Sequence, residues 1–492
     1  MRDEKRIEFG DWQTPKELAE GVVSLLASNV RVPASILEPT CGRGAFLAAA
    51  AAVFPKARLL GFDLNESYVR DARDALTGYD AEIAVADFFQ VKWEDVLARL
   101  PSPVLVIGNP PWVTNSALGA LDAGNLPAKT NFKNLSGLDA MTGKSNFDIS
   151  EWMLLRLLQA ANGSDTTLAM LCKAGVARKV MEHVASQRWN LQGSVHAIDA
   201  RTHFAAAVDA VLLTVHRPSS ALQKGHAHKW SVYESITAST PSKHMGVVDG
   251  QLCSDVDAYL ATRNLEGPSE IEWRSGIKHD CARIMELEIV DDHLVNGMGK
   301  RVDLEREYVY PLLKGSDLAN GRMSARRRVV VPQRSLGENT GAIRDRAPST
   351  WAYLISHREH LDARKSSIYR DQPPFAIFGV GDYSFSPYKV AICGLYKRIA
   401  FTVIRPIDGQ PVMVDDTAYF LPCKTEEEAS ELASVLNGEK ASAFFTARIF
   451  WDAKRPINKA LLQSLSLDAL LRAEGFGPRP RLARSPQQAF AF

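Results

Sequence analysis

The sequence has few cysteines, no long apolar segment and almost no net charge. Its 492 residues include six cysteines, and no two of them form a CxxC pair. This spacing favours neither a structural zinc site nor a disulfide framework. The longest apolar run covers residues 45–54, which is too short to cross a bilayer. The first residues, MRDEKRIEFGDWQTP, contain no apolar segment typical of a secretion signal. We therefore expect a soluble, cytoplasmic protein without a metal ion.

The net charge of +1 gives no general signal for a nucleic-acid partner, but the positive charge is unevenly distributed. Residues 321–334 contain five arginines and no acid, and residues 452–456 and 477–486 form smaller basic clusters. A phosphate backbone would favour such clusters. For each cluster alone, the alternative is a solvated charged face without a partner.

Up to about residue 217, short apolar runs alternate with helical patterns. Continuous apolar strands between amphipathic helices indicate a parallel sheet that is covered on both faces. We therefore predict an α/β, doubly wound, Rossmann-like catalytic domain over residues 1–217. Residues 218–270 are predicted to connect it to an α+β domain over residues 271–474. The Pro- and Arg-rich residues 475–492 are predicted to form a disordered tail.

Four unusual groups of residues follow predicted strands of the first domain. They are Glu38-Pro39-Thr40-Cys41, Asp63-Leu64, Asp87-Phe88 and Asn109-Pro110-Pro111-Trp112. Ligands of open α/β sheets bind outside the carboxyl ends of the strands. We therefore expect the four groups to line one binding site.

The first three groups suit a nucleoside. Gly42 and Gly44 lie between a strand and a helix, where missing side chains let a ligand approach the backbone. A tight turn is the structural alternative. Asp63 follows Gly44 by 19 positions, and an acid there can accept both ribose hydroxyls. Asp87 can accept the amine of an adenine ring, and Phe88 can lie against that ring. Capping of the next helix is the alternative for both acids.

The fourth group suits chemistry on a planar NH₂ group, which is a poor nucleophile because its lone pair is delocalised. The side-chain oxygen of Asn109 and the carbonyl of Pro110 can accept its two N–H groups. Pro110 and Pro111 fix the direction of that carbonyl. This grip would free the lone pair without a metal or a titrating base. Trp112 offers a face on which a flipped base can stack, and burial of Trp112 in the core is the alternative.

The order of these motifs resembles the gamma-class adenine-N6 DNA methyltransferases, which use S-adenosylmethionine. The matching segments are QTPKELAEGVVSLL, LEPTCGRGAF, NPPW and FDISEWMLLRLL. The resemblance implies that Asn109, Pro110, Pro111 and Trp112 are catalytic. It also implies a second aromatic against the flipped base, where Phe204 is the candidate and His203 its competitor. The implied cofactor-binding residues are Thr14, Glu38, Pro39, Thr40, Cys41, Gly42, Gly44, Asp63, Leu64, Asp87, Phe88 and Asn109.

Four later segments resemble the target-recognition regions of the same enzymes, which implies that the second domain reads a site on double-stranded DNA. They are WRSGIKHDC, VYPLLKGSDL, DYSFSPYKV and FWDAKRPINKALLQSLSL. The candidate DNA-binding side chains are Arg326, Arg327, Arg328, Lys454 and Arg455. The resemblance also implies a monomer. The sequence shows no nuclease pattern and no N-terminal extension to hold one, so any cognate restriction endonuclease is expected on a separate chain.

The Asn-Pro-Pro-aromatic signature also occurs in enzymes that methylate protein glutamine or guanine N2 of RNA. All these targets are planar NH₂ groups, so the signature alone cannot choose among them. DNA is favoured because a threonine-proline segment precedes the cofactor loop and about 270 residues follow the catalytic part. A catalytically silent DNA-binding relative is a further alternative, although every catalytic position holds a competent residue.

Overall fold

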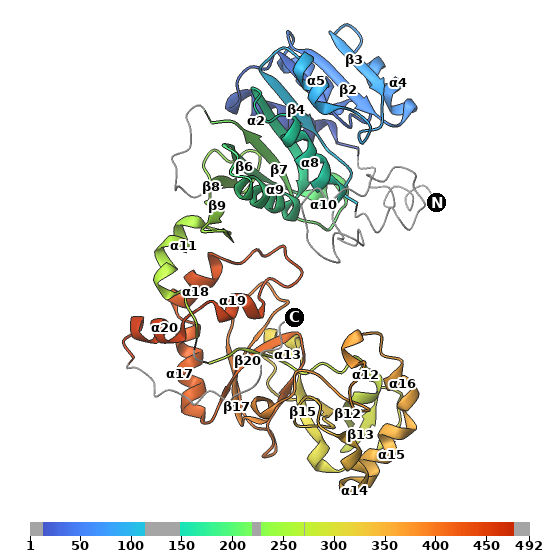
Figure 1. The fold of residues 1–492 in the computed structure, drawn as a ribbon, viewed down its shortest axis with the longest axis vertical. Coiled ribbons are helices and arrows are strands. Elements are labelled where there is room, and N and C mark those ends of the chain that lie inside the picture. The colour runs from blue at the N-terminus through green and yellow to red at the C-terminus, as the bar shows by residue number, and fades with distance from the viewer. Residues whose placement is uncertain (1–12, 114–147, 219–227, 270, 477–492) are drawn as a thin grey trace. The chain divides into compact units, whose positions relative to one another are not determined.

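The computed structural model describes residues 13–113, 148–218, 228–269 and 271–476. The chain divides into two compact units, residues 1–257 and residues 258–492 (Figure 1). Almost all of the expected disordered tail lies outside the described residues. None of the described helices is long and apolar enough to span a membrane.

The first unit is built on one ten-stranded sheet with the order β10-β9-β8-β6-β7-β5-β4-β1-β2-β3. Neighbours from β3 to β5 pair in parallel, and β7 is antiparallel to both β5 and β6. The first seven strands are β1 (Ser35–Glu38), β2 (Arg58–Asp63), β3 (Ala81–Val85), β4 (Val104–Gly108), β5 (Thr166–Lys173), β6 (Gln192–Ile198) and β7 (Ala210–His216). This arrangement confirms the predicted Rossmann-like α/β class.

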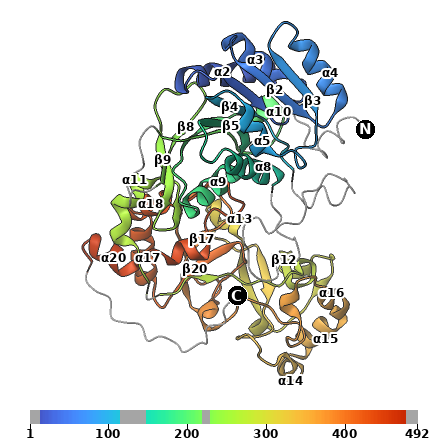
Figure 2. The same cartoon turned by 45° about the horizontal axis from the view of Figure 1, so that its top comes forward.

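Helices cover both faces of this sheet because its strands are apolar on both sides. One core cluster joins alternate strand residues such as Leu105 and Ile107 to four helices, of which α2 and α3 pack side by side (Figure 2). Those helices are α2 (Lys16–Asn29), α3 (Ala45–Val53), α4 (Glu66–Ala75) and α10 (Ala200–Phe204). The intervening strand residues face the other layer, because successive side chains of a strand point to opposite faces. That layer contains α5 (Trp93–Arg99), α8 (Ile149–Ala160) and α9 (Ala174–Ser186) (Figure 1).

Three further strands correct the predicted connecting region at 218–270. They are β8 (His228–Tyr233), β9 (Lys243–Val248) and β10 (Gln251–Cys253), and β8 pairs in parallel with β6. These strands extend the ten-stranded sheet of the first unit, with Trp230 fully buried, so this unit ends at residue 257 rather than at 217. Helix α11 (Val256–Thr262) and η1 (Arg263–Leu265) follow them.

The second unit contains a four-stranded and a six-stranded sheet, as expected for an α+β domain. The four-stranded sheet has the order β11 (Arg274–Ser275), β20 (Ala418–Cys423), β17 (Tyr388–Cys393) and β18 (Thr402–Ile404). The six-stranded sheet has the order β14 (Arg301–Val302), β13 (His293–Asn296), β12 (Glu286–Val290), β16 (Arg327–Val330), β15 (Val309–Leu313) and β19 (Met413–Val414).

Each of these sheets has its own helical cover. The core of the four-stranded sheet includes α17 (Glu426–Leu436), α18 (Glu439–Thr446), α19 (Lys459–Gln463) and α20 (Leu467–Ala473). The core of the six-stranded sheet includes α12 (Ala282–Met285), α14 (Ile343–Arg346), α15 (Pro348–Ser356) and α16 (Arg358–Asp362). A third cluster packs α13 (Gly315–Ala319) against β17, β18 and β19.

Candidate active site

The carboxyl ends of β1 to β4 meet at one edge of the sheet. Glu38 and Asp63 are the last residues of β1 and β2, Asp87 follows β3, and Asn109 directly follows β4. Because the order β3-β2-β1-β4 is parallel throughout, these four side chains line the same edge. This edge is the candidate site.

The glycine loop after β1 is held by Asp63. Its carboxylate accepts hydrogen bonds from the backbone N–H groups of Gly42 and Asn65, each at 2.8 Å. Gly42 and Gly44 have φ values of 51° and 79°, in the left-handed region that favours glycine. The side chain that caps α4 is Asn65, which accepts from Ser67, so Asp63 is not the helix cap.

Gln13, which the sequence did not single out, packs against the same loop. Its side-chain oxygen accepts the N–H of Arg43 at 3.2 Å. A Cβ added to Gly42 would lie 2.7 Å from this oxygen, so a larger residue there would displace the Gln13 side chain. The loop is therefore fixed from both sides, by Asp63 and by Gln13.

Glu38 is a buried carboxyl group. Burial, and then the charge of Asp63, raises its pKa well above the usual range, while a hydrogen bond from the Leu47 backbone partly opposes the rise. Among the described residues, the Oε2 atom of Glu38 and the Oγ1 atom of Thr40 are buried without a hydrogen-bond partner. Buried polar atoms are normally paired, so these two atoms mark a place where a polar ligand group would be stabilised.

The remaining predicted cofactor residues differ in exposure. Pro39 and Cys41 are buried, whereas Leu64 is exposed. Burial raises the pKa of the Cys41 thiol, and the nearby carboxylates of Glu38 and Asp63 raise it further, so this thiol remains protonated. Cys41 therefore packs in the loop and is not a nucleophile.

Asp87 and Phe88 both take part in local structure. Asp87 accepts the backbone N–H of Phe89 at 3.0 Å and the side-chain N–H of Gln90 at 3.3 Å. The Phe88 ring is buried against Trp93, with ring centroids 4.7 Å apart. Asp87 thus holds the turn after β3 and does not cap the next helix, because α5 begins at Trp93 and the residue before it is Lys92.

Asn109 lies beside the threonine-proline segment that precedes α2. Its side-chain nitrogen donates to the Oγ1 atom of Thr14 at 3.4 Å. Because Gln13 contacts the glycine loop and Thr14 contacts Asn109, two consecutive residues link the loop to the NPPW segment. Pro110 is buried and Pro111 is partly buried.

The two predicted base-stacking aromatics are in contact with each other. The rings of Trp112 and Phe204 meet edge to face, with centroids 5.2 Å apart and an interplanar angle of 70°. Both are buried in the core cluster on the α2 face, and Trp112 is only 6% exposed. His203 is next to Phe204, with ring centroids 6.4 Å apart. In this conformation Trp112 thus corresponds to the core alternative rather than to an open platform.

A basic residue that the sequence did not reveal holds the end of the NPPW segment. Lys173, at the end of β5, donates to the carbonyl oxygen of Trp112 at 2.9 Å and to the carboxylate of Asp148 at 2.6 Å. Asp148 also caps α8 by accepting the N–H of Ser150. In the sequence, this contact could have been suspected only from a lysine at the end of an apolar strand, Lys173, and an aspartate before a helix, Asp148.

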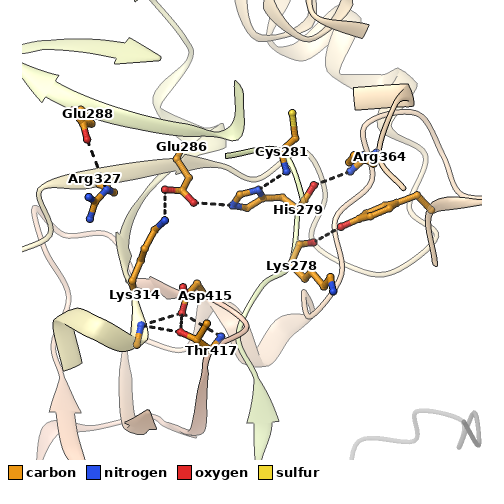
Figure 3. Close-up of polar contacts among 12 residues, drawn as sticks. Lys278, His279, Cys281, Glu286, Glu288, Lys314, Arg327, Arg364, Asp415 and Thr417 are labelled. Carbon is orange, nitrogen blue, oxygen red and sulfur yellow. Dashed lines mark hydrogen bonds and ion pairs between the residues drawn. The ribbon is translucent and has the colours of Figure 1, made fainter. Parts of the chain in front are cut away.

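In the second unit, two of the segments that resemble target-recognition regions meet (Figure 3). His279 Nε2 lies 3.4 Å and Lys314 Nζ lies 2.7 Å from the carboxylate of Glu286. Next to Lys314, Gly315 donates its backbone N–H to Asp415 at 3.0 Å. These contacts join β12 and β15 to the chain leading into β20, which gives His279 and Lys314 structural roles.

The candidate DNA-binding side chains fall into two groups. Arg328 forms an ion pair with Asp408 at 2.9 Å, and Arg455 donates to the Asp416 carbonyl and the Tyr419 hydroxyl. Arg327 lies 3.9 Å from Glu288. Arg326 and Lys454, in contrast, are exposed.

Comparison with known proteins identifies one relative along nearly the whole chain. The type II methyltransferase M.NspV from Nostoc sp. (strain ATCC 29411 / PCC 7524) is 44% identical over 477 residues, covering 96% of this chain and 98% of that protein. The type II methyltransferase M.CvrRI from Paramecium bursaria Chlorella virus XZ-6E is 30% identical over 122 residues, covering 23% of this chain and 30% of that protein. No protein-family model matches the chain.

The fold also matches a solved structure, that of the type IIL restriction-modification enzyme MmeI in complex with DNA. The TM-score is 0.50 with 14% identity, and the match covers 94% of this chain. The chain spans 65% of the length of MmeI, and at this level of identity the likeness concerns the fold.

Proposed function

Because this chain belongs to the type II methyltransferases of restriction-modification systems, we propose that its substrate is an adenine in duplex DNA, methylated at N6. The proposal places the chain in the gamma class, on the order of its motifs and the NPPW segment. It includes duplex DNA as the partner, a monomeric enzyme and a cognate restriction endonuclease on a separate chain.

The family implies S-adenosylmethionine as the methyl donor, which when bound supplies an electrophilic methyl group on a positively charged sulfur. The residues at the sheet edge fit such a ligand. The buried Oε2 of Glu38 and Oγ1 of Thr40 lack partners among the described residues, and a cationic ligand group would favour ionisation of the Glu38 carboxyl. The ligand would be held by Thr14, the loop of residues 38–44, Asp63-Leu64 and Asp87-Phe88.

The contact between Asn109 and Thr14 is the observation that carries the proposal. In this contact the amide nitrogen of Asn109 points towards Thr14, whose neighbour Gln13 contacts the glycine loop. The amide oxygen of Asn109 therefore points away from Thr14. That oxygen and the Pro110 carbonyl would accept the two N–H groups of adenine N6. The attacking nitrogen would thereby be oriented beside the cofactor loop, where its lone pair could form the N–CH₃ bond as the S–CH₃ bond of the donor breaks, with the surplus amine proton passing to solvent.

The target adenine lies inside the duplex, so it must leave the stack to reach this site. Trp112 and Phe204 would contact the flipped base. Since the two rings now pack against each other, entry of the base requires them to separate.

Long-read sequencing of DNA from cells that express the chain tests the proposal. The expected result is N6-methyladenine in one fixed sequence context. Asn109→Ala is expected to remove the modification while leaving DNA affinity nearly intact. Asn162→Ala, an exposed asparagine before β5 at the opposite edge of the sheet, is the matched control and should retain the modification. Absence of any modified base with the unchanged protein would point to an RNA or protein substrate, and an active Asn109→Ala protein would refute the role of Asn109.

A further inference from the structure

The turn between β17 and β18 displays apolar and cationic side chains together. Leu395 is 39% exposed and Tyr396 is 42% exposed, and the next two residues, Lys397 and Arg398, are exposed as well. Large apolar side chains at the tip of a turn are costly to leave in water, and beside two cations they offer apolar and ionic contacts at one place. The turn is therefore a candidate binding element.

Two other segments meet this turn at the end of β17. The N–H of Ile457 donates to the carbonyl of Gly394 at 3.4 Å, which brings the 450–457 loop against the base of the turn. On another side, Leu318 and Ala319 of α13 line a pocket of about 170 Å³ together with Tyr396 and Arg398. The 320–328 segment that follows α13 packs Met323 and Ala325 on the cluster containing Ala391 of β17 and Ile404 of β18.

These three segments are strongly basic. Residues 320–328, 394–398 and 450–457 together contain eight Arg or Lys residues and one acid, Asp452. Several of these cations have partners within the protein, among them Arg328 and Arg455. Arg326, Arg398 and Lys454 are exposed, one on each segment. Arg322, Arg327 and Arg328 lie against acids outside these segments, so the three exposed cations are the ones that can attract a polyanion.

We propose that Arg326, Leu395, Tyr396, Arg398 and Lys454 form a DNA-contacting surface, the basic turn surface. The three cations bind backbone phosphates on either side of the turn, and Leu395 and Tyr396 pack against base edges in a groove. This inference rests on the proposed function, which makes duplex DNA the partner. It assigns DNA contact to the β17–β18 turn, whereas the His279 and Lys314 segments hold the two sheets together.

The two kinds of contact have different signatures in solution. Each phosphate contact contributes about 0.9 to the slope of log K against log salt concentration, because binding releases a counterion. The double variant Arg326→Ala/Arg398→Ala is therefore expected to reduce that slope by about 1.8 for a short random-sequence DNA duplex. Replacing both residues by lysine should restore it, since lysine retains the charge.

The apolar tip should behave in the opposite way. Leu395→Ser/Tyr396→Ala removes contact area but no charge, so the affinity for the duplex should fall about tenfold while the salt slope stays unchanged. Fluorescence anisotropy over a salt series measures both quantities. Cofactor affinity and the melting temperature are expected to remain at their original values in all these variants, because the changed side chains are exposed.

Lys300→Ala/Arg301→Ala is the matched control. These exposed cations lie at β14, the edge strand of the six-stranded sheet opposite β19, and their loss should leave the slope unchanged. Two results would refute the basic turn surface. In the first, the unchanged protein binds and methylates DNA, and the turn variants bind with the same affinity and the same salt slope. In the second, the salt slope of the control variant decreases as much as that of the Arg326/Arg398 variant. A protein that neither binds nor modifies DNA would instead refute the proposed function itself.

Discussion

The ammonium group of Lys173 donates a hydrogen bond to the carbonyl oxygen of Trp112 across 2.9 Å. The same ammonium group contacts the carboxylate of Asp148 at 2.6 Å, and the two side chains are 28% and 9% exposed. Because Asp148 caps α8 and Trp112 ends the NPPW segment, this ion pair ties together β5, α8 and the chain that follows β4. The direction of the Trp112 peptide group is thus fixed from outside the motif.

We expect Lys173→Met to lower kcat for methyl transfer about tenfold while the cofactor dissociation constant stays unchanged. The change removes a charge-assisted hydrogen bond, worth about 1.5–3 kcal/mol, that orients the motif. It also leaves the Asp148 carboxylate without its cation, so the melting temperature should fall. Lys173 is a positioning residue in this account, and the split between kcat and the cofactor constant is the readout.

Lys179→Met provides the control for that experiment. Lys179 of α9 contacts the buried carboxylate of Glu151 of α8 at 2.7 Å, and within the described residues it forms no hydrogen bond to the NPPW segment. It should lower the melting temperature and leave kcat intact. Equal losses of kcat in the two variants would show that Lys173 acts only through stability.

The raised pKa of Glu38 makes both stability and cofactor binding depend on pH. Above the ordinary glutamic acid pKa of 4.5, the folded protein retains a proton that the unfolded chain loses. The free energy of unfolding therefore falls as the pH rises through this range towards the folded-state pKa. Glu38→Gln removes that loss, so its melting temperature should fall less than that of the unchanged protein as the pH rises above 4.5.

The ionisation of Glu38 should also affect cofactor affinity, but with the opposite dependence on pH. A cationic ligand favours the ionised carboxyl, so the affinity of the unchanged protein should rise with pH, and Glu38→Gln should bind weakly with little pH dependence. Calorimetric titration at several pH values measures this. Identical pH profiles for the two proteins would remove Glu38 from the cofactor site.

Asp63 is expected to act on the cofactor both directly and through the glycine loop. Asp63→Ala removes the acceptor of the Gly42 and Asn65 backbone N–H groups, and cofactor affinity should fall at least about tenfold. Asp71→Ala is the control, since Asp71 lies 3.3 Å from the exposed side chain of Arg43 in the same loop and not against its backbone N–H groups. An unaltered dissociation constant for Asp63→Ala would place the ribose site elsewhere.

The sequence predicted those parts of the fold that local patterns determine. Buried parallel strands are apolar throughout, so the runs before Glu38, Asp63 and Asn109 were visible, and so were the polar residues that end them. Strands β8 to β10 were missed, because their place depends on the pairing of β8 with β6. No local pattern records that pairing.

The contacts of individual polar side chains were equally hidden. Lys173 is separated by 61 residues from Trp112 and by 25 from Asp148, and a lysine at a strand end has many other uses. Within the arginine cluster, the partner of Arg328 is Asp408, 80 residues away. The composition of the sequence therefore indicates where the basic segments lie. It does not show that Arg328 is paired with Asp408 while Arg326 is exposed.

The contact between Trp112 and Phe204 leads to a last prediction. If the two rings separate to receive the base, their loss should affect base flipping beyond its effect on stability. We expect Trp112→Phe and Phe204→Leu each to reduce turnover about tenfold, which corresponds to the loss of part of a stacking contact worth about 1–3 kcal/mol. The fluorescence of a 2-aminopurine placed at the target adenine should rise less than with the unchanged protein, because fewer bases leave the stack.

Phe54→Leu separates this role from simple core packing. Phe54 belongs to the same core cluster as Trp112 and Phe204 and is comparably buried, at 7% exposure against 5% for Phe204. It follows α3 at the end remote from the glycine loop, so Phe54→Leu should reduce the melting temperature about as much as Phe204→Leu does. The turnover and 2-aminopurine signal of Phe54→Leu should stay unchanged, since Phe54 lies at the end of α3 remote from the glycine loop. If all three variants lost turnover only in proportion to stability, the two rings would be core residues and the base would stack elsewhere.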